Sequence, residues 1–167
     1  MIKIGGLSFS YPGSEAKILE DINLIIEPGS RVVLTGLNGA GKSTLLSIIA
    51  GHKMVEPGVV AVLGMDPFRD LKCSEHIRFV ASDWIHNVPS LGNQLTVDDL
   101  LSGILSDTNA SFHNQTRMMR LLGVNRNWQV SSVSEGQRRR IQLLLKLIKK
   151  ASVILLDEAT TGAVLFR

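Results

Sequence analysis

The chain has 167 residues with a formal net charge of +3, and 44% of its residues are hydrophobic. This length allows one domain with its own core, and the composition excludes a disordered chain. The small positive excess is weak evidence for nucleic-acid binding, and no window approaches the roughly 18 apolar residues of a membrane span. The single cysteine, Cys73, excludes an internal disulfide and favours a reducing, cytoplasmic compartment.

The first third of the chain predicts β-structure around one strand–loop–helix unit. Residues 2–11 and 18–26 predict two strands joined by a turn at residues 12–14. Residues 31–35 are apolar and β-branched, which predicts a buried parallel strand. A helix over residues 43–50 should end at Gly51, and residues 59–63 predict a further strand.

The loop between the predicted strand and helix reads Gly-Leu-Asn-Gly-Ala-Gly-Lys-Ser-Thr and matches G-x-x-x-x-G-K-[ST] throughout. Its glycines let successive N–H groups turn toward phosphate oxygens, and the helix N-terminus adds a partial positive charge. In this pattern the lysine reaches the β- and γ-phosphates and the serine hydroxyl binds Mg²⁺. We therefore predict a nucleoside triphosphate site in which Lys42 also serves catalysis and Ser43 is a metal ligand. Its residues are Gly36, Asn38, Gly39, Ala40, Gly41, Lys42, Ser43 and Thr44.

The second half predicts strands at both ends of a helical region. Residues 77–81 predict a buried strand, and residues 96–123 carry helical periodicity with Thr96 and Asp98 near its start. Residues 137–150 predict the clearest helix, and residues 152–156 predict a second buried strand.

Two carboxylates, Asp157 and Glu158, follow this last strand directly. Side chains at the carboxyl end of a parallel strand face the ligand crevice. We expect Asp157 to hold Mg²⁺ and Glu158 to orient or deprotonate an attacking water. A solvated acidic turn is the alternative, and the phosphate loop 115 residues upstream (157 − 42) argues against it.

The run Val133-Ser134-Glu135-Gly136-Gln137 resembles the Leu-Ser-Gly-Gly-Gln loop that opens a helix in the ATP-binding-cassette (ABC) ATPases, and Asp157 follows Ser134 by 23 residues. The resemblance implies that Ser134, Gly136 and Gln137 bind the γ-phosphate held by a second subunit's phosphate loop. Glu135 replaces the family's first glycine. It either weakens this contact or points into solvent as a helix-end carboxylate, and we favour the second.

A further resemblance to the family lies in the run Leu7-Ser8-Phe9-Ser10-Tyr11. In the family, the last aromatic residue of this strand stacks on adenine, so the resemblance implies that Tyr11 binds the base. The alternative is a tyrosine that simply ends a strand. The resemblance spans Tyr11 to Glu158. It implies an α/β fold of the P-loop NTPase class, with an antiparallel β subdomain, a parallel-sheet core and a helical subdomain. We expect one incomplete domain, divided into residues 1–82 (β subdomain and phosphate-loop core), 83–132 (helical subdomain) and 133–167 (signature helix and Walker B strand).

The sequence departs from the family's pattern in two regions. Ser82 or Asp83 stands where the family has a glutamine that touches Mg²⁺, since Gln94 lies too far along the chain. Val164 occupies the place of a further aspartate, and no histidine follows His113, where the family has one that contacts the γ-phosphate. We therefore expect a truncated or mis-spliced form in which ATP binding is safer to predict than turnover.

The function that the resemblance implies is ATP binding and Mg²⁺-dependent hydrolysis by a soluble ABC-type ATPase. Such a module forms a head-to-tail homodimer, or a heterodimer with another ABC domain, and drives an unidentified protein partner. The Asp83-Trp84 pair and the run from Ser134 to Arg140 resemble the soluble CCR4-associated-factor branch. The alternatives are a nucleotide-binding module without turnover and the nucleotide-binding subunit of a membrane transporter.

The helix predicted over residues 137–150 carries five basic residues mostly on one arc: Arg138, Arg139, Lys146, Lys149 and Lys150. A solvated face of an amphipathic helix explains them better than a nucleic-acid surface, because no aromatic residues interleave with the charges.

Overall fold

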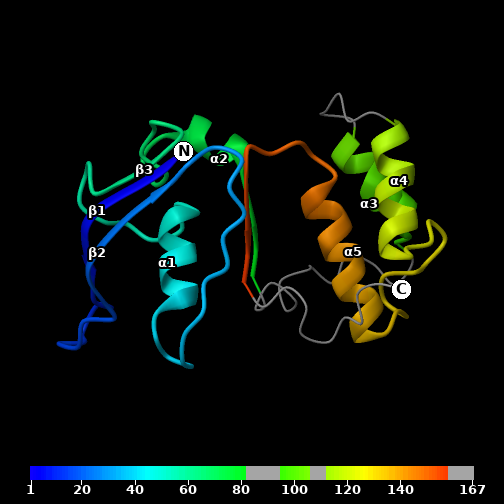
Figure 1. Cartoon of the computed structure of the whole chain (residues 1–167). Helices are drawn as coiled ribbons and strands as arrows, with labels where there is room; N and C mark the ends of the chain where they lie inside the picture. Colours follow the sequence, from blue (N-terminus) through cyan, green and yellow to red (C-terminus); the bar gives the residue numbers. More distant parts are fainter. Residues whose placement is uncertain (82–94, 106–111, 158–167) are drawn as a thin grey trace. The chain divides into compact units, whose positions relative to one another are not determined.

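The computed structural model describes residues 1–81, 95–105 and 112–157. It divides into two compact units, Met1–Phe79 and Val80–Arg167 (Figure 1). The elements of each unit largely follow the hydrophobic patterns of the sequence.

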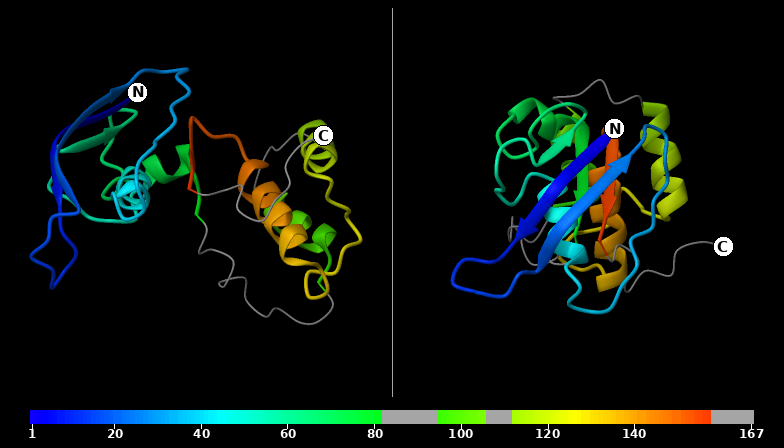
Figure 2. Two further views of the ribbon diagram at one scale, coloured as in Figure 1. Left: turned by 60° about the horizontal axis from the view of Figure 1, so that its bottom comes forward. Right: turned by 60° about the vertical axis from the view of Figure 1, so that its left-hand side comes forward.

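The first unit is built around an antiparallel sheet in which β1 (Ile2–Phe9) lies between β2 (Leu19–Ile26) and β3 (Val60–Val62) (Figure 2). Ile2 pairs with Ile26 on one side and with Val62 on the other. The strands predicted over residues 2–11, 18–26 and 59–63 are therefore confirmed, with slightly shorter bounds.

The core face of β1 shows an uneven spacing, since Ile2, Ile4 and Leu7 are all buried. Strict alternation would bury residues two apart. The register shifts between Ile4 and Leu7, and Gly6 adopts a positive φ of 64° there. The Gly6 N–H donates to Asn23 Oδ1 at 2.8 Å, so the backbone amide at the irregularity is still hydrogen-bonded.

The strand predicted over residues 31–35 is wrong for this structure. These residues belong to neither of the two sheets formed by the described residues, and all five are exposed, Val33 by 84%. A strand needs a neighbour that accepts and donates its backbone hydrogen bonds. The apolar, β-branched composition indicates a preference for extended backbone, but it does not show whether a neighbouring strand is present.

The helix α1 (Lys42–Ile49) packs Leu45, Ile48 and Ile49 into the core of the first unit. Its predicted end is confirmed, because Gly51 adopts a left-handed φ of 75°. The Gly51 N–H donates to Ile48 O at 3.0 Å and the His52 N–H to Ser47 O at 2.9 Å. These two bonds form a Schellman motif, which satisfies carbonyls left over at the helix end.

The short helix α2 (Leu71–His76) was not predicted from the sequence. Six residues give too little periodicity to recognise, and the signal that was present is its N-cap. The Asp70 carboxylate accepts a hydrogen bond from the Lys72 N–H at 2.9 Å. Cys73 is the one residue of this helix that is buried.

The strands β4 (Ile77–Val80) and β5 (Val153–Leu156) form a separate two-stranded sheet. The Asp157 N–H donates to Val80 O at 2.9 Å. Val80 ends β4 and Asp157 directly follows β5, so the carboxyl ends of the two strands meet and the pair is parallel. Both strands lie where the sequence predicted them.

The second unit packs three helices around one core: α3 (Val97–Leu105), α4 (Phe112–Leu122) and α5 (Glu135–Leu147) (Figures 1 and 2). The buried members of this core come from the three helices, from β4, and from Val124 and Ile148 just beyond α4 and α5. They are Val80, Val97, Leu101, Met119, Leu122, Val124, Ile141, Leu143, Leu144 and Ile148. The helical regions predicted over residues 96–123 and 137–150 are confirmed in position. No described helix has the length and apolarity needed to cross a bilayer.

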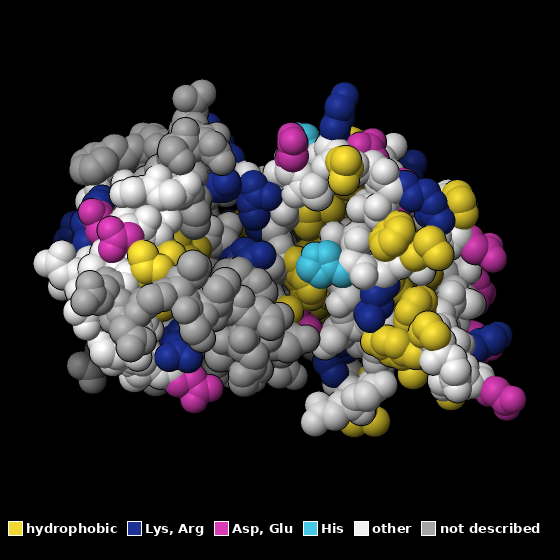
Figure 3. Space-filling view, turned by 180° about the vertical axis from the view of Figure 1, so that it is seen from behind, with side chains coloured by type: hydrophobic (Ala, Val, Ile, Leu, Met, Phe, Trp, Pro, Cys, Tyr) yellow, Lys and Arg dark blue, Asp and Glu magenta, His cyan; other side chains and the backbone are white. Residues whose placement is uncertain are grey.

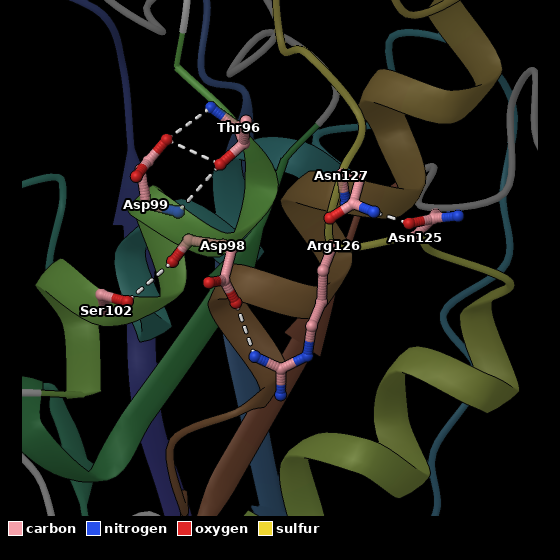
Figure 4. A network of polar contacts seen from close by, with 7 residues as sticks. All are labelled: Thr96, Asp98, Asp99, Ser102, Asn125, Arg126 and Asn127. Atoms are coloured by element: carbon pink, nitrogen blue, oxygen red, sulfur yellow. Dashed lines mark hydrogen bonds and ion pairs between the residues drawn. The ribbon is translucent and has the colours of Figure 1, made fainter.

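The start of α3 is held by a polar network, which Figure 4 shows from close by. Thr96 donates its N–H and its hydroxyl to Asp99 Oδ2, at 2.8 and 2.6 Å, while the Asp99 N–H donates to Thr96 Oγ1. Arg126 forms an ion pair with Asp98. These contacts satisfy the N-terminal groups of α3 and tie them to the segment that follows α4.

Candidate functional site

The phosphate loop of the first unit has the backbone conformation that its glycines allow. Gly39 and Gly41 have φ values of 83° and 84°, which a side chain would disfavour. Gly41 is the N-cap of α1 and supplies no side-chain hydrogen bond to the first turn. The amide groups at this helix end are therefore not satisfied by a capping side chain, as a phosphate site requires.

Close packing also restricts Gly41. A Cβ built at this position would lie 2.8 Å from Leu19 Cδ2 and 3.0 Å from the Ile18 carbonyl oxygen. The same construction at Gly39 meets nothing within 4 Å. Gly41 is therefore needed both for its φ and for its contact with the strand β2, whereas Gly39 is needed for its φ alone.

Lys42 folds back over the loop that precedes it. Its Nζ donates to the carbonyl oxygens of Gly36 and Leu37, at 2.9 and 2.8 Å. These two bonds place the ammonium group beside the loop backbone, while Ser43 follows it in the first turn of α1. An anion held by the loop would thus have a cation at close range.

Tyr11 lies next to the same helix, although 33 residues separate it from Thr44. The two hydroxyl oxygens are 3.0 Å apart, within hydrogen-bonding distance. The Phe9 ring meets the Tyr11 ring edge to face, with centroids 5.3 Å apart. Tyr11 remains 39% exposed, so the aromatic residue predicted to bind a base is both anchored at the loop helix and open to solvent.

Lys53 is a member of this cluster that the sequence did not reveal. Its Nζ lies 4.6 Å from the centroid of the Tyr11 ring. The position lies just beyond the end of α1, and no motif marked it. Gly51 was the one signal available, since it fixes where the chain turns after the helix.

The second unit contains the other predicted site residues. Ser134 is the N-cap of α5, and its hydroxyl accepts a hydrogen bond from the Gln137 N–H. The Gln137 side chain accepts from the Ser134 N–H in return, which completes a capping box. Gly136 lies in the first turn, and Glu135 is exposed there, where a carboxylate favours the helix dipole.

Asp157 is 8% exposed at the carboxyl end of the parallel pair β4–β5. Its backbone is held by the bond from its N–H to Val80 O. Glu158, Ser82, Asp83, Gln94 and Val164 lie outside the described residues. The structure thus places Asp157, the predicted metal ligand, at a strand end. The water-activating role of Glu158 stays a prediction.

The expectation that Arg139 belongs to a solvated basic face is wrong. Arg139 is 2% exposed, and its Nη1 donates to Ala81 O at 2.9 Å and to Gln142 Oε1 at 3.4 Å. The helix α5 is buried around more of its circumference than its apolar residues alone predicted, so Arg139 and Gln142 face the interior. Burial lowers the pKa of the Arg139 guanidinium from its usual value.

A shallow depression of about 660 Å³ lies on the second unit, and none of the predicted site residues lines it. It is lined by the end of α4 and by residues 123–128, including Trp128. The Arg140 guanidinium lies over the Trp128 ring, 5.4 Å from its centroid. On the face drawn in Figure 3, apolar side chains are interspersed with Lys and Arg.

The model of one protein family, described as "ABC transporter", matches residues 19–161 of this chain. This range includes the phosphate loop, the capped start of α5 and Asp157. The chain belongs to the ABC transporter family. Its fold is that of the ABC ATPase domains.

Two curated relatives illustrate the match. ABC transporter I family member 21 of Arabidopsis thaliana is 37% identical over 169 residues, which cover 95% of this chain and 58% of that protein. CCR4-associated factor 16 of Saccharomyces cerevisiae is 31% identical, with coverage of 95% and 59%. The chain therefore spans less than two thirds of the length of these relatives.

One solved ABC structure has the same fold at low sequence identity. It is the dimeric post-hydrolysis state of an ATP-binding cassette bound to ADP and Pi, with a TM-score of 0.75 and 21% identity. The match covers 98% of this chain and 76% of that one. The α/β P-loop class expected from the sequence is confirmed by this likeness and by the antiparallel sheet, parallel pair and helices of the structure.

Proposed function

We propose that the chain binds ATP at the Gly36–Thr44 loop, with Tyr11 stacked on the base. The observation that carries this proposal is the 3.0 Å contact between the hydroxyls of Tyr11 and Thr44. It joins the exposed aromatic ring to the helix that begins in the phosphate loop. A flat ring beside an anion-binding loop fits the two chemically different ends of a nucleotide.

The donors at the loop suit a polyphosphate. The turned glycines and the uncapped start of α1 offer backbone N–H groups, and Lys42 supplies a positive charge within the loop. The Ser43 hydroxyl and the Asp157 carboxylate are oxygen ligands of the kind that Mg²⁺ prefers. When bound, Mg²⁺ would neutralise charge on the β- and γ-phosphates.

We further propose that ATP is hydrolysed, with Glu158 orienting and deprotonating the attacking water. Lys42 would stabilise the charge that develops on the transferred phosphoryl group. These roles follow the positions of the residues in the family's motifs, with Glu158 directly after Asp157 in the chain.

A second ABC domain, identical or different, would complete the site in a head-to-tail dimer. Ser134, Gly136 and Gln137 would face the γ-phosphate held by the second subunit. The capping box is compatible with this role, because a hydroxyl that accepts one hydrogen bond still carries a proton to donate. The solved relative described above is itself dimeric, which supports the proposal. The cycle of ATP binding and hydrolysis would act on a protein partner. We also propose the division of the domain into residues 1–82, 83–132 and 133–167.

Binding and hydrolysis are separated by two variants. Lys42→Ala should abolish ATP binding measured by calorimetry, whereas Lys72→Met, an exposed lysine of the same unit, should leave it unchanged. Glu158→Gln should retain binding, lose single-turnover hydrolysis and raise the dimer fraction seen by sedimentation with ATP. Unchanged turnover in Glu158→Gln would contradict the hydrolytic role, and failure of the unaltered chain to bind ATP would contradict the whole proposal.

A further inference from the structure

The Tyr11 ring is held from three directions. Its hydroxyl meets Thr44 Oγ1 at 3.0 Å, and Phe9 packs against it edge to face. The Lys53 ammonium lies over the ring, 4.6 Å from its centroid. A cation within about 6 Å of a ring centroid is attracted by the negative face of the aromatic system.

The backbone that carries Lys53 is fixed by the end of α1. Gly51 and His52 donate the two hydrogen bonds of the Schellman motif, so the chain reverses direction immediately before Lys53. Gly51 also packs tightly, since a Cβ there would lie 2.0 Å from the Pro67 carbonyl oxygen. The Tyr11 side chain therefore contacts the chain at both ends of α1, with its hydroxyl at Thr44 in the first turn and its ring at Lys53 beyond the helix end.

We propose that Lys53 is a positioning residue of the nucleotide site, which covers one face of Tyr11 and directs the base to the other. The proposal rests on the proposed binding of ATP. An aromatic ring has two faces, and a half-exposed ring that rotates freely offers both. A cation on one face and a hydrogen bond at the hydroxyl fix the plane of the ring before the base arrives, which reduces the entropy lost on binding.

The location of Lys53 separates this role from phosphate binding. The hydroxyl end of Tyr11 points to Thr44 and the phosphate loop, whereas Lys53 contacts the face of the ring. Lys42 already supplies the cation at the loop. The expected contribution of Lys53 therefore depends on the base and not on the charge of the phosphates.

The first experiment compares Lys53→Met with the unaltered chain, using Mg²⁺-ATP and inorganic tripolyphosphate as ligands in calorimetry. Lys53→Met should weaken ATP binding about two- to fivefold, the loss expected if the freed ring holds the orientation that accepts the base for only about a fifth to a half of the time, and should leave tripolyphosphate binding unchanged. Lys53→Arg should restore the affinity for ATP, because a guanidinium also stacks on a ring. Lys72→Met serves as the matched control. Equal losses for both ligands, no loss, or tighter ATP binding would each overturn the proposal.

The second experiment follows the Lys53 ε-methylene protons by NMR. Ring current should shift them upfield in the unaltered chain, and Tyr11→Leu should remove the shift. The shift should persist when ATP is added, because the base occupies the opposite face. Its loss on addition of ATP would show that the base displaces Lys53 and would overturn the proposal. If the unaltered chain binds neither ATP nor tripolyphosphate, the proposed function fails and the role of Lys53 fails with it.

Discussion

Ser134 and Gln137 cap each other at the start of α5. The Gln137 N–H donates to Ser134 Oγ at 3.3 Å, and the Ser134 N–H donates to Gln137 Oε1 at 2.8 Å. These are two of the residues that the family resemblance implies for phosphate binding. Each therefore has a measurable structural role that does not depend on any nucleotide.

We predict that Ser134→Ala destabilises the second unit without any ligand present, by about 1 kcal/mol, because the first turn of α5 loses its cap. Urea unfolding followed by tryptophan fluorescence in a Trp84→Phe background, where Trp128 is the one remaining indole, measures the change. Ser132→Ala, in the preceding turn, is the control and should have a smaller effect. If Ser134→Ala leaves stability unchanged and only weakens nucleotide binding, the capping box is not an important stabilising feature.

Gly51→Ala should destabilise the first unit more than Gly58→Ala. Both glycines have a left-handed φ, 75° and 82°, which costs an alanine roughly 1–2 kcal/mol. A Cβ at Gly58 meets nothing within 4 Å, whereas at Gly51 it overlaps the Pro67 carbonyl, so backbone must move. Thermal unfolding of the two variants gives the comparison. Equal destabilisation would mean that the contact with Pro67 is relaxed at no cost.

Arg139→Ala should cost roughly 2–4 kcal/mol, since it opens a cavity at a buried side chain and removes the donor from the partly buried Ala81 carbonyl. Arg138→Ala, one position earlier and less buried, should change stability by about 0.5 kcal/mol or less. Chemical unfolding of both variants tests the difference. Similar losses of stability in the two variants would show that Arg139 lies on a solvated face, as the sequence predicted.

The stability contribution of Asp99 should depend on pH. Hydrogen bonds from Thr96 hold the pKa of Asp99 below its ordinary value. The folded pKa is thus lower than the unfolded one, so the contribution is complete above the unfolded pKa, about 3.9, and is lost as the pH falls through the folded value. The stability difference between the unaltered chain and Asp99→Asn should therefore be largest near neutral pH and shrink in acid. A difference that is constant with pH would contradict this account.

Cys73 should react slowly with thiol reagents in the folded chain. It is fully buried, and burial together with the charges of Asp70 and Asp66 raises the pKa of its thiol. It is the single cysteine of the chain, so a colorimetric thiol assay reports on this position alone. Unfolding in urea should bring the reaction to completion rapidly. Equally fast labelling of the native chain would show that α2 opens readily.

The success of the sequence-based predictions depended on whether a feature is local. The helix α5 and the turn at Gly51 are specified by caps and periodicity within a few residues, and the structure contains both. The strand predicted over residues 31–35 failed because a strand depends on a partner elsewhere in the chain. The burial of Arg139 was missed for a similar reason. Charged residues are usually exposed, and the carbonyl acceptor that allows Arg139 to be buried is known only from the structure.

In the candidate site, too, local motifs could be recognised from the sequence, whereas contacts between distant residues could not. The motif identified the loop residues from Gly36 to Thr44, and the family resemblance identified Tyr11. Their proximity, through the hydroxyls of Tyr11 and Thr44, required the three-dimensional structure. Lys53 lies outside every motif and is recognised only by its place over the ring.

The division of the chain between Phe79 and Val80 also separates its natural chromophores. The single tyrosine, Tyr11, belongs to the first unit, and Trp128 belongs to the second. In a Trp84→Phe variant, excitation selective for indole therefore reports on the second unit through Trp128, while the Cys73 thiol reports on the first. Unfolding curves recorded with these two intrinsic probes on the same unlabelled chain would measure directly how much of the folding free energy the two units share.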